Sequence, residues 1–366
     1  MTVSLAMIVR NEVATLPRLL DSVAGFVDEI VIVDTGSNDG TLDVAQRYTD
    51  NVATITWPDD FSVARQEAFD RASGEWVCWL DADDVVLGAE HIRRLAGEAP
   101  RDVDGFYWRY VYGQDPAGRS TCEFWRERCV RNDGSFRWQG RVHETLWSSA
   151  PARLVRSDAV VVEHHSPPDR AEAKSRRNLA LLERELEDSR GRPSARLLFY
   201  LGREHDELGD VEEAIAAFER CAAVSTWDEE RYVTQLHLSD LHRRAGRFDR
   251  AIDADLRSLT ICPHWPNAYF SLAATYYFLA DWHKVIHWAE LGRAMPEPDT
   301  LQIMDPMAYR YRWLIYYTNA LYHVGALDDA RAWTARALQQ VPDDRQHLAN
   351  LRFFAQAGEA TAGAGR

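Results

Sequence analysis

The chain has 366 residues, which is long enough for two domains with separate hydrophobic cores. Its 42 basic and 57 acidic residues give a formal charge of -15, so broad binding to nucleic acid is not expected. The 5 cysteines form no CxxC pair, which favours reduced thiols in a cytoplasmic protein over a disulfide framework. No apolar run approaches the length of a membrane-spanning helix, so the sequence predicts no membrane span.

The first half of the chain alternates short β-rich runs with helical patterns. Strands are expected over 5–9, 29–33, 52–57 and 76–80, and helices over 16–26, 42–48 and 63–72. This alternation predicts βαβ units and a mostly parallel sheet. From about Gly105 the pattern turns to aromatic, strand-like segments, expected as antiparallel additions over one end of the sheet: 106–112, 123–130 and 159–162. We therefore predict an α/β domain with a Rossmann-like mixed sheet.

The second half, after Pro167-Pro168, carries long helical patterns with almost no strand signal. Small residues recur there at the offsets of the tetratricopeptide repeat (TPR), a helix–turn–helix unit of about 34 residues. Two clear copies and two weaker ones carry the pattern, at Leu201, Gly202, Gly209, Ala214, Phe218 and Cys221; Ser239, Gly246, Ala251, Ser258 and Pro263; Ala274, Tyr277 and Asp281; and Gly325, Ala330, Ala337 and Pro342. A generic helical bundle is the simpler alternative, since few positions define each copy.

These patterns give the expected domain organisation. We predict the α/β domain over 1–168, a connecting helix over 169–190, an all-α domain of TPR-like helical repeats over 191–358 and a flexible tail over 359–366. Because helical repeat arrays present extended concave binding surfaces, the all-α half predicts a peptide or protein partner.

Three acids follow the buried strand that ends near Leu80. Asp81, Asp83 and Asp84 lie at its carboxyl end, where mutual repulsion and desolvation both disfavour them. A divalent cation such as Mg²⁺ or Mn²⁺ removes this conflict, because it takes one or two carboxylates together with the oxygens of a diphosphate. The segment therefore predicts a metal–diphosphate site at the carboxyl end of the sheet. Asp84 receives no role here beyond capping the segment that follows.

Two further segments are candidates for ligand binding. Asp34 ends a strand and precedes the turn 35–41, which lacks the GxGxxG pattern of dinucleotide-binding folds. Its carboxylate suits either a turn or a hydrogen bond to a ribose hydroxyl or a base N–H. Arg65 follows the helix start at Asp60, and it either faces solvent or, beside a metal site, pairs with phosphate or orients an acid.

Taken together, four segments resemble the motifs of family 2 glycosyltransferases of GT-A fold. They are Met7–Glu12, Val33–Thr41, Phe61–Arg65 and Leu80–Asp83, in the order and spacing of that family. The whole layout, with TPRs after such a domain, resembles the sublancin-type bacterial peptide glycosyltransferases. The resemblance implies a GT-A fold, Mn²⁺ or Mg²⁺ as cofactor, and a nucleotide sugar, a UDP-hexose in the first instance, as the donor.

The resemblance also implies roles for individual residues at the donor site. Asp34 would contact the nucleoside, although Thr35 stands where many relatives have a second acid. Asp81 and Asp83 match the DxD motif, so Asp81 would hold the ribose and Asp83 the metal. The first and third motifs place Arg10, Glu12 and Arg65 at the same site.

Two later segments complete the implied site. His164 aligns with a family histidine and would be a second metal ligand, whereas its residues alone favour an ordinary surface loop. The segment Gly140–Glu144 matches the family pattern G-x-V-H-E and supplies a general base, either His143 or Glu144. We favour Glu144, since inverting GT-A enzymes generally use a carboxylate. The structural alternative is an ion pair between Glu144 and Arg141 or Arg137.

Three functions remain open at this point. The leading hypothesis is an inverting hexosyltransferase that modifies a Cys, Ser or Thr side chain of a peptide held by the TPRs. A second keeps the chemistry but uses a saccharide or lipopolysaccharide-type acceptor. A third, non-catalytic TPR binding protein is disfavoured because the acids and histidines of the site are all present. A homodimer is a further expectation.

Overall fold

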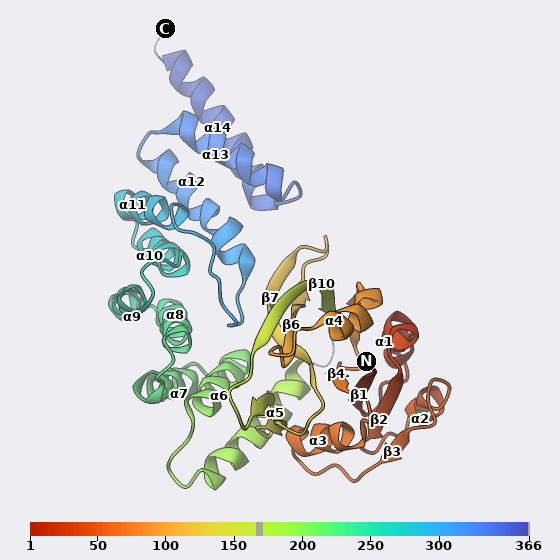
Figure 1. Cartoon of the computed structure of the whole chain (residues 1–366). Coiled ribbons are helices and arrows are strands. Elements are labelled where there is room, and N and C mark those ends of the chain that lie inside the picture. Colours follow the sequence, from red (N-terminus) through yellow and green to blue (C-terminus); the bar gives the residue numbers. More distant parts are fainter. Residues whose placement is uncertain (166–170, 365–366) are drawn as a thin grey trace. The chain divides into compact units, whose positions relative to one another are not determined.

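The computed structural model describes residues 1–165 and 171–364, and packing divides the chain into two compact units (Figure 1). The first unit, Met1–Pro193, contains an eight-stranded mixed sheet, and the described part of the second, from Ser194, contains helices and no strand. These units confirm the predicted order of an α/β domain and an all-α domain. The boundary expected at Pro167-Pro168 lies outside the described residues, and helix α5 (Ala171–Asp188) belongs to the first unit.

The elements of the first unit match most of the expected ones. The strands are β1 (Val3–Val9), β2 (Glu29–Asp34), β3 (Val52–Thr54), β4 (Trp76–Trp79), β5 (Asp84–Leu87), β6 (Gly105–Gln114), β7 (Ser120–Arg131), β8 (Phe136–Gln139), β9 (Thr145–Ser148) and β10 (Leu154–His164). The helices before α5 are α1 (Leu16–Val23), α2 (Thr41–Ala45), α3 (Phe61–Arg71) and α4 (Ile92–Glu98). Sequence analysis did not predict β5, α4 or the β8–β9 hairpin.

Strand direction gathers the predicted site at one edge of the sheet. The strand order is β3-β2-β1-β4-β7-β6-β10-β5, and β1, β2, β3 and β4 are mutually parallel. Because β7 is antiparallel to both β4 and β6, and β10 is parallel to β6, the strands β6 and β10 point the same way as β4. Only β7 of the three late segments therefore runs against the central strands, which corrects the expectation of antiparallel additions.

The core of the first unit lies on both faces of this sheet. Alternate residues of β1 show the arrangement, because successive side chains of a strand point to opposite faces. Leu5 and Met7 pack with the apolar residues of α1, α2 and α4. Ala6 and Ile8 pack with α3 and with the β8–β9 hairpin. A sheet covered on both faces leaves the ends of its strands as the places where polar groups can meet a ligand.

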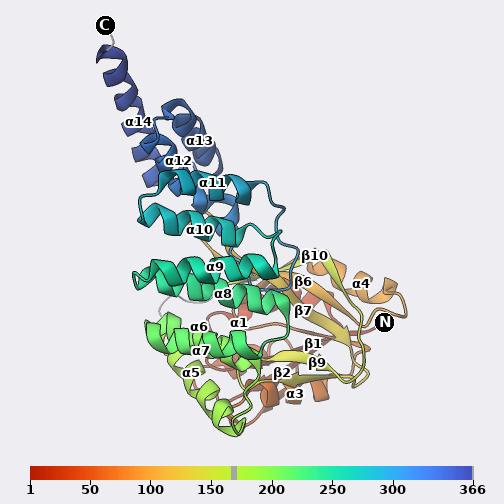
Figure 2. The same cartoon turned by 90° about the vertical axis from the view of Figure 1, so that its left-hand side faces the viewer.

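The second unit is built from antiparallel helix pairs that follow one another in order (Figure 2). Its helices are α6 (Ala195–Leu208), α7 (Val211–Val224), α8 (Asp228–Arg244), α9 (Phe248–Ile261), α10 (Asn267–Phe278), α11 (Trp282–Arg293), α12 (Trp313–His323), α13 (Leu327–Gln340) and α14 (Arg345–Ala364). The pairs α6–α7, α8–α9, α10–α11 and α12–α13 correspond to the four predicted copies. The flexible tail over 359–366 stays a prediction, and residues 365–366 lie outside the described part of the chain.

A close approach of helices explains why small residues recur in the repeats. At Gly202 of α6, an added Cβ would lie 2.9 Å from atoms of the Phe218 ring of α7. Gly292 of α11 meets the Phe270 ring of α10 in the same way, at 2.8 Å. A larger residue at either position would force the helix pair apart. No helix among the described residues has the length and apolar character needed to cross a membrane.

One buried acid distinguishes the second unit. Asp255 of α9 is fully buried, beside Ser239 of α8 and Ser271 of α10. Burial raises the pKa of the Asp255 carboxyl to about 7, and the neighbouring serine hydroxyls and the charge of Arg243 only partly offset it. A raised pKa in the folded state means that stability is lost as the pH rises from the ordinary value toward 7 and the buried group ionises.

We predict that Asp255→Asn stabilises the second unit increasingly with pH. Because one pKa unit corresponds to about 1.4 kcal/mol, the gain in unfolding free energy should grow by roughly 2–3 kcal/mol between pH 5 and pH 8. Denaturant unfolding at both pH values measures it. Asp253→Asn, an exposed acid of the same helix that pairs with Arg257, is the matched control and should show no such growth. An equal gain from Asp255→Asn at both pH values would contradict the raised pKa.

Candidate active site

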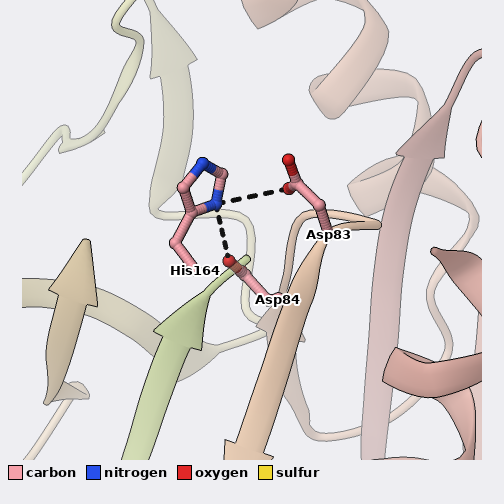
Figure 3. A group of neighbouring side chains, drawn as sticks. All are labelled: Asp83, Asp84 and His164. Carbon is pink, nitrogen blue, oxygen red and sulfur yellow. Dashed lines mark hydrogen bonds and ion pairs between the residues drawn. The ribbon is translucent and has the colours of Figure 1, made fainter. Parts of the chain in front are cut away.

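The acids that follow β4 meet His164 through the short strand β5. Asp84 is the first residue of β5, which pairs antiparallel with the end of β10 so that His164 lies opposite Asp84. Two strands, β7 and β6, separate β4 from β10 within the sheet. The chain therefore crosses from the centre of the sheet to its far side immediately after β4, and this crossing brings Asp83 and Asp84 to the histidine (Figure 3).

Asp83, Asp84 and His164 form a cluster with the composition of a metal site. The Nδ1 atom of His164 lies 3.3 Å from Asp83 Oδ1 and 3.4 Å from Asp84 Oδ1, and one ligand atom from each residue lies within 4.8 Å of the others (Figure 3). Two carboxylates and one imidazole nitrogen fit a divalent cation such as Mn²⁺ and leave positions for phosphate oxygens. Burial alone would lower the pKa of His164, but hydrogen bonds to the two acids raise it to about 10.

Asp84 has a larger part in this cluster than the sequence indicated. Its side chain is fully buried, so it does more than cap the following segment. The Tyr110 hydroxyl donates to its Oδ1 atom at 3.0 Å, and the backbone N–H of Asp81 donates to Oδ2 at 2.9 Å. Burial raises the pKa of the Asp84 carboxyl, against the opposing charge of Arg128. The β-branched pair Val85-Val86 is the sequence signal for a strand that begins at Asp84, and it could have predicted that this acid is part of β5.

Arg128, which the sequence analysis did not single out, is the cation that lies beneath the acids. Its side chain is fully buried on β7, between the Trp79 ring at 3.9 Å and the Tyr110 ring at 4.2 Å. Its Nη1 atom lies 3.4 Å from Asp84 Oδ2 and 3.8 Å from Asp81 Oδ2. A buried guanidinium stacked between aromatic rings keeps its charge and offsets the repulsion between the two carboxylates.

Arg65 joins the DxD segment to the proposed base. It is buried near the start of α3, where the Asp60 carboxylate caps the helix by accepting from Ser62 N at 2.8 Å. Arg65 Nη2 donates to Asp81 Oδ1 at 2.5 Å, and Arg65 Nε donates to Glu144 Oε1. One rigid guanidinium thus holds two acids from separate segments at fixed positions.

Glu144 lies at the entry to β9 and is almost fully buried. Burial alone would raise its pKa, but the charge and hydrogen bond of Arg65 outweigh burial, so the pKa of Glu144 is lowered and the group is ionised at neutral pH. The partner of Glu144 is therefore Arg65, whereas Arg141 pairs with Asp188 of α5 at 2.6 Å. His143 adopts a left-handed conformation, with φ of 53°, in the bend that delivers Glu144 to the site.

The remaining predicted residues lie along the same edge of the sheet, with different degrees of burial. Asp34 is fully buried at the end of β2, and its carboxylate accepts from the backbone N–H groups of Gly36 and Ser37, each at 3.0 Å. Glu12 follows β1 and accepts from the Thr15 hydroxyl at 2.6 Å. Arg10 is exposed at the end of β1. In the structure, Asp34 and Glu12 thus order their own loops.

A family model and several curated proteins match this chain. Residues 4–151 match the model described as glycosyl transferase family 2. A TPR repeat-containing protein of Synechococcus elongatus is 32% identical over 266 residues, which cover 69% of this chain and 64% of that protein. The prophage-derived glycosyltransferase SunS of Bacillus subtilis is 29% identical over 223 residues, or 58% of this chain and 51% of that protein.

A third relative matches a shorter stretch. A PGL/p-HBAD biosynthesis glycosyltransferase of Mycobacterium bovis is 35% identical over 142 residues, which cover 36% of this chain and 47% of that protein. The chain thus spans about half to two thirds of the length of the curated relatives that it matches.

The position of Arg128 leads to a stability prediction. Arg128→Met keeps the apolar contact with Trp79 and Tyr110 but leaves Asp84 without its buried cation, so the first unit should lose about 3–5 kcal/mol of unfolding free energy at pH 7.5. Arg71→Met is the matched control, because Arg71 forms an exposed pair with Glu67 on α3 and should cost less than about 1 kcal/mol. Chemical denaturation measures both. Equal losses in the two variants would refute a neutralising role for Arg128.

Proposed function

We propose that the chain transfers a hexose from a nucleotide sugar, with inversion, to a peptide or protein side chain, because residues 4–151 match the model of glycosyl transferase family 2. The observation that carries the proposal is the position of Arg65, whose guanidinium contacts both Asp81 of the DxD segment and Glu144. This arrangement sets a carboxylate base next to the acids proposed to hold the donor. A UDP-hexose is the first donor to test.

On the donor side, the proposal assigns the nucleoside to Asp34 and the ribose to Asp81. Asp83 and His164 would hold Mn²⁺ or Mg²⁺, and Asp84 would be a further ligand, since its Oδ1 atom lies 3.4 Å from the same Nδ1 atom of His164. When bound, the cation supplies Lewis-acid stabilisation of the diphosphate that leaves. Arg10 and Glu12, on the loop after β1, stay candidates for donor contacts through the family resemblance alone.

On the acceptor side, Glu144 takes the proton of the attacking group. Arg65 keeps the Glu144 carboxylate ionised and fixes its direction, so the base needs no reorganisation when the acceptor arrives. His143 stays the alternative base, since it precedes Glu144 in the same bend. Cys, Ser and Thr are the acceptor side chains to compare, because each presents a thiol or hydroxyl proton within reach of a carboxylate.

The helical repeats support a peptide acceptor over a saccharide. Stacked helix pairs such as α6–α7 and α8–α9 present a surface longer than one sugar ring, which suits an extended peptide. The relative from Synechococcus elongatus is also named for TPR repeats and matches more than half of this chain. A saccharide acceptor is the outcome that an acceptor screen has to exclude.

Replacement of the base is the first test of the mechanism. Glu144→Gln should bind UDP-hexose with nearly wild-type affinity, because the amide keeps the shape of the side chain. It should transfer about 10²- to 10⁴-fold more slowly, since general base catalysis contributes that much. Glu67→Gln, an exposed acid of α3, is the control. Full transfer by Glu144→Gln together with loss in His143→Asn would assign the base to His143.

Metal removal is the second test. Chelation with EDTA should stop hydrolysis and transfer of the donor by the full chain, and Mn²⁺ or Mg²⁺ should restore both, because the leaving diphosphate needs a counter-charge. Asp83→Ala should abolish the restoration, whereas Asp70→Ala, an exposed acid of α3, should not. Activity of Asp83→Ala that still depends on Mn²⁺ would show that the cation binds elsewhere.

An acceptor screen tests the role of the second unit. The full chain is offered nucleotide sugars with peptides encoded beside its gene and with saccharides, and products are followed by mass spectrometry. Residues 1–193, the first compact unit, should hydrolyse the donor but lose transfer to the peptide. Transfer to a peptide that survives this truncation would remove the second unit from acceptor binding. Transfer to saccharides alone would replace the peptide hypothesis.

A further inference from the structure

Helix α5 belongs to the first unit and lies beyond the segment that matches the family model (Figure 1). Its side chains contact segments that carry the candidate active site. Its last turn holds the segment that carries the proposed base, because Glu185 accepts from the backbone N–H of Arg141 at 2.9 Å. The preceding residue of the helix, Arg184, pairs at 2.6 Å with Asp59, which lies just before α3. The first turns of the same helix carry Lys174, at the metal side of the site.

The surroundings of Lys174 differ from those of the other cations at the site. Its Nζ atom donates to the Tyr112 hydroxyl at 2.8 Å, and the Tyr112 ring stacks on the His164 ring with centroids 4.7 Å apart and an angle of 6° between the planes. One aromatic ring therefore separates the ammonium from a candidate metal ligand. Arg65 and Arg128 are each held by carboxylates, whereas Lys174, among the residues that the structure describes, has a neutral hydroxyl as its hydrogen-bond acceptor.

Within residues 1–165 and 171–364, the Tyr112 hydroxyl is the hydrogen-bond acceptor of the half-buried Lys174 ammonium, which leaves donors for a ligand. Lys carries three N–H donors, and the Tyr112 hydroxyl takes one of them. Burial alone would lower the pKa of Lys174, but the Tyr112 oxygen and the charges of Asp83 and Asp81 raise it, so the group stays cationic. Anchoring α5 by itself does not need a charge at this position, because Arg177, which packs on Phe61 at 5.1 Å, and Arg184 already attach the helix.

We propose that Lys174 is a diphosphate-binding residue, which donates to an oxygen of the β-phosphate of the donor. The inference rests on the proposed function. In the transfer step, the bond from the anomeric carbon to the β-phosphate oxygen breaks and its electron pair stays on that oxygen. The nucleophile forms the new bond to carbon and gives its proton to Glu144. The diphosphate thereby gains one negative charge, and Lys174 stabilises that charge as it develops.

Binding measurements with the full chain test this role. UDP and UMP are each titrated calorimetrically into wild type and variants in the presence of Mn²⁺, with GDP and CDP alongside in case the base differs. Lys174→Met should weaken UDP binding by about 10- to 100-fold, as expected for loss of a hydrogen bond to a charged group, and leave UMP binding nearly unchanged. Lys174→Arg should recover part of the UDP affinity, because it restores the charge.

Two further variants separate phosphate binding from a structural role. Arg176→Ala removes an exposed partner of Glu172 on the same helix and should bind UDP like wild type. Tyr112→Phe keeps the ring against His164 and removes the anchor of Lys174. If Lys174 only docks α5, Lys174→Met and Tyr112→Phe will weaken UDP and UMP equally, and the proposal falls.

The remaining outcomes are also decisive. Unchanged UDP affinity in Lys174→Met overturns the assignment of Lys174 and leaves the proposed function intact, provided that wild type binds the diphosphate. Absence of binding of every nucleoside diphosphate by wild type, with Mn²⁺ present, overturns the proposed donor site and this inference together. A loss selective for the diphosphate supports both.

Discussion

Burial of like charges at one end of the sheet is the constraint on which the site depends. Asp81 and Asp84 lie close enough for the charge of Asp81 to raise the pKa of Asp84, in surroundings where an ionised group is costly without a partner. Arg128 between two aromatic rings and Arg65 on α3 supply the opposing charge. Both guanidinium groups pair with carboxylates and so hold the acids of the site in place. Under the proposed function, a divalent cation and further basic residues would neutralise the diphosphate of the donor.

The path of the chain after β4 explains how distant segments share this constraint. Parallel strands place Asp34 and the DxD segment at one edge, as in open α/β sheets generally. The crossing through β5 then pairs Asp84 with His164, which lies on β10, three places further along the sheet than β4. Helix α5 adds contacts at the same edge, because Glu185 accepts from the backbone N–H of Arg141 and Lys174 donates to the Tyr112 hydroxyl. The site is therefore assembled from both halves of the first unit.

Much of this arrangement was predictable from local patterns. Alternating strands and helices predicted the parallel sheet, and small residues at repeat offsets predicted the helix pairs, because both signals lie within short windows of sequence. Asp83 and His164 could be named as candidate metal ligands from motifs. Arg128, Tyr110 and Lys174 could not, since a lone Arg or Lys in a strand or helix carries no signal of its partner. Asp84 was underestimated because its burial depends on β5, a four-residue strand whose pairing with β10 is long-range.

Under the proposed function, one divalent cation would join His164 to the diphosphate of the donor. Electron–nuclear double resonance on Mn²⁺ bound to the full chain with UDP measures this directly, because the spin of Mn²⁺ couples to each ligand nucleus. The account predicts a nitrogen coupling that is absent in His164→Ala, together with phosphorus couplings from UDP in the same complex. Phosphorus couplings without any histidine nitrogen would contradict it, since the cation would then be held by the nucleotide and by acids alone.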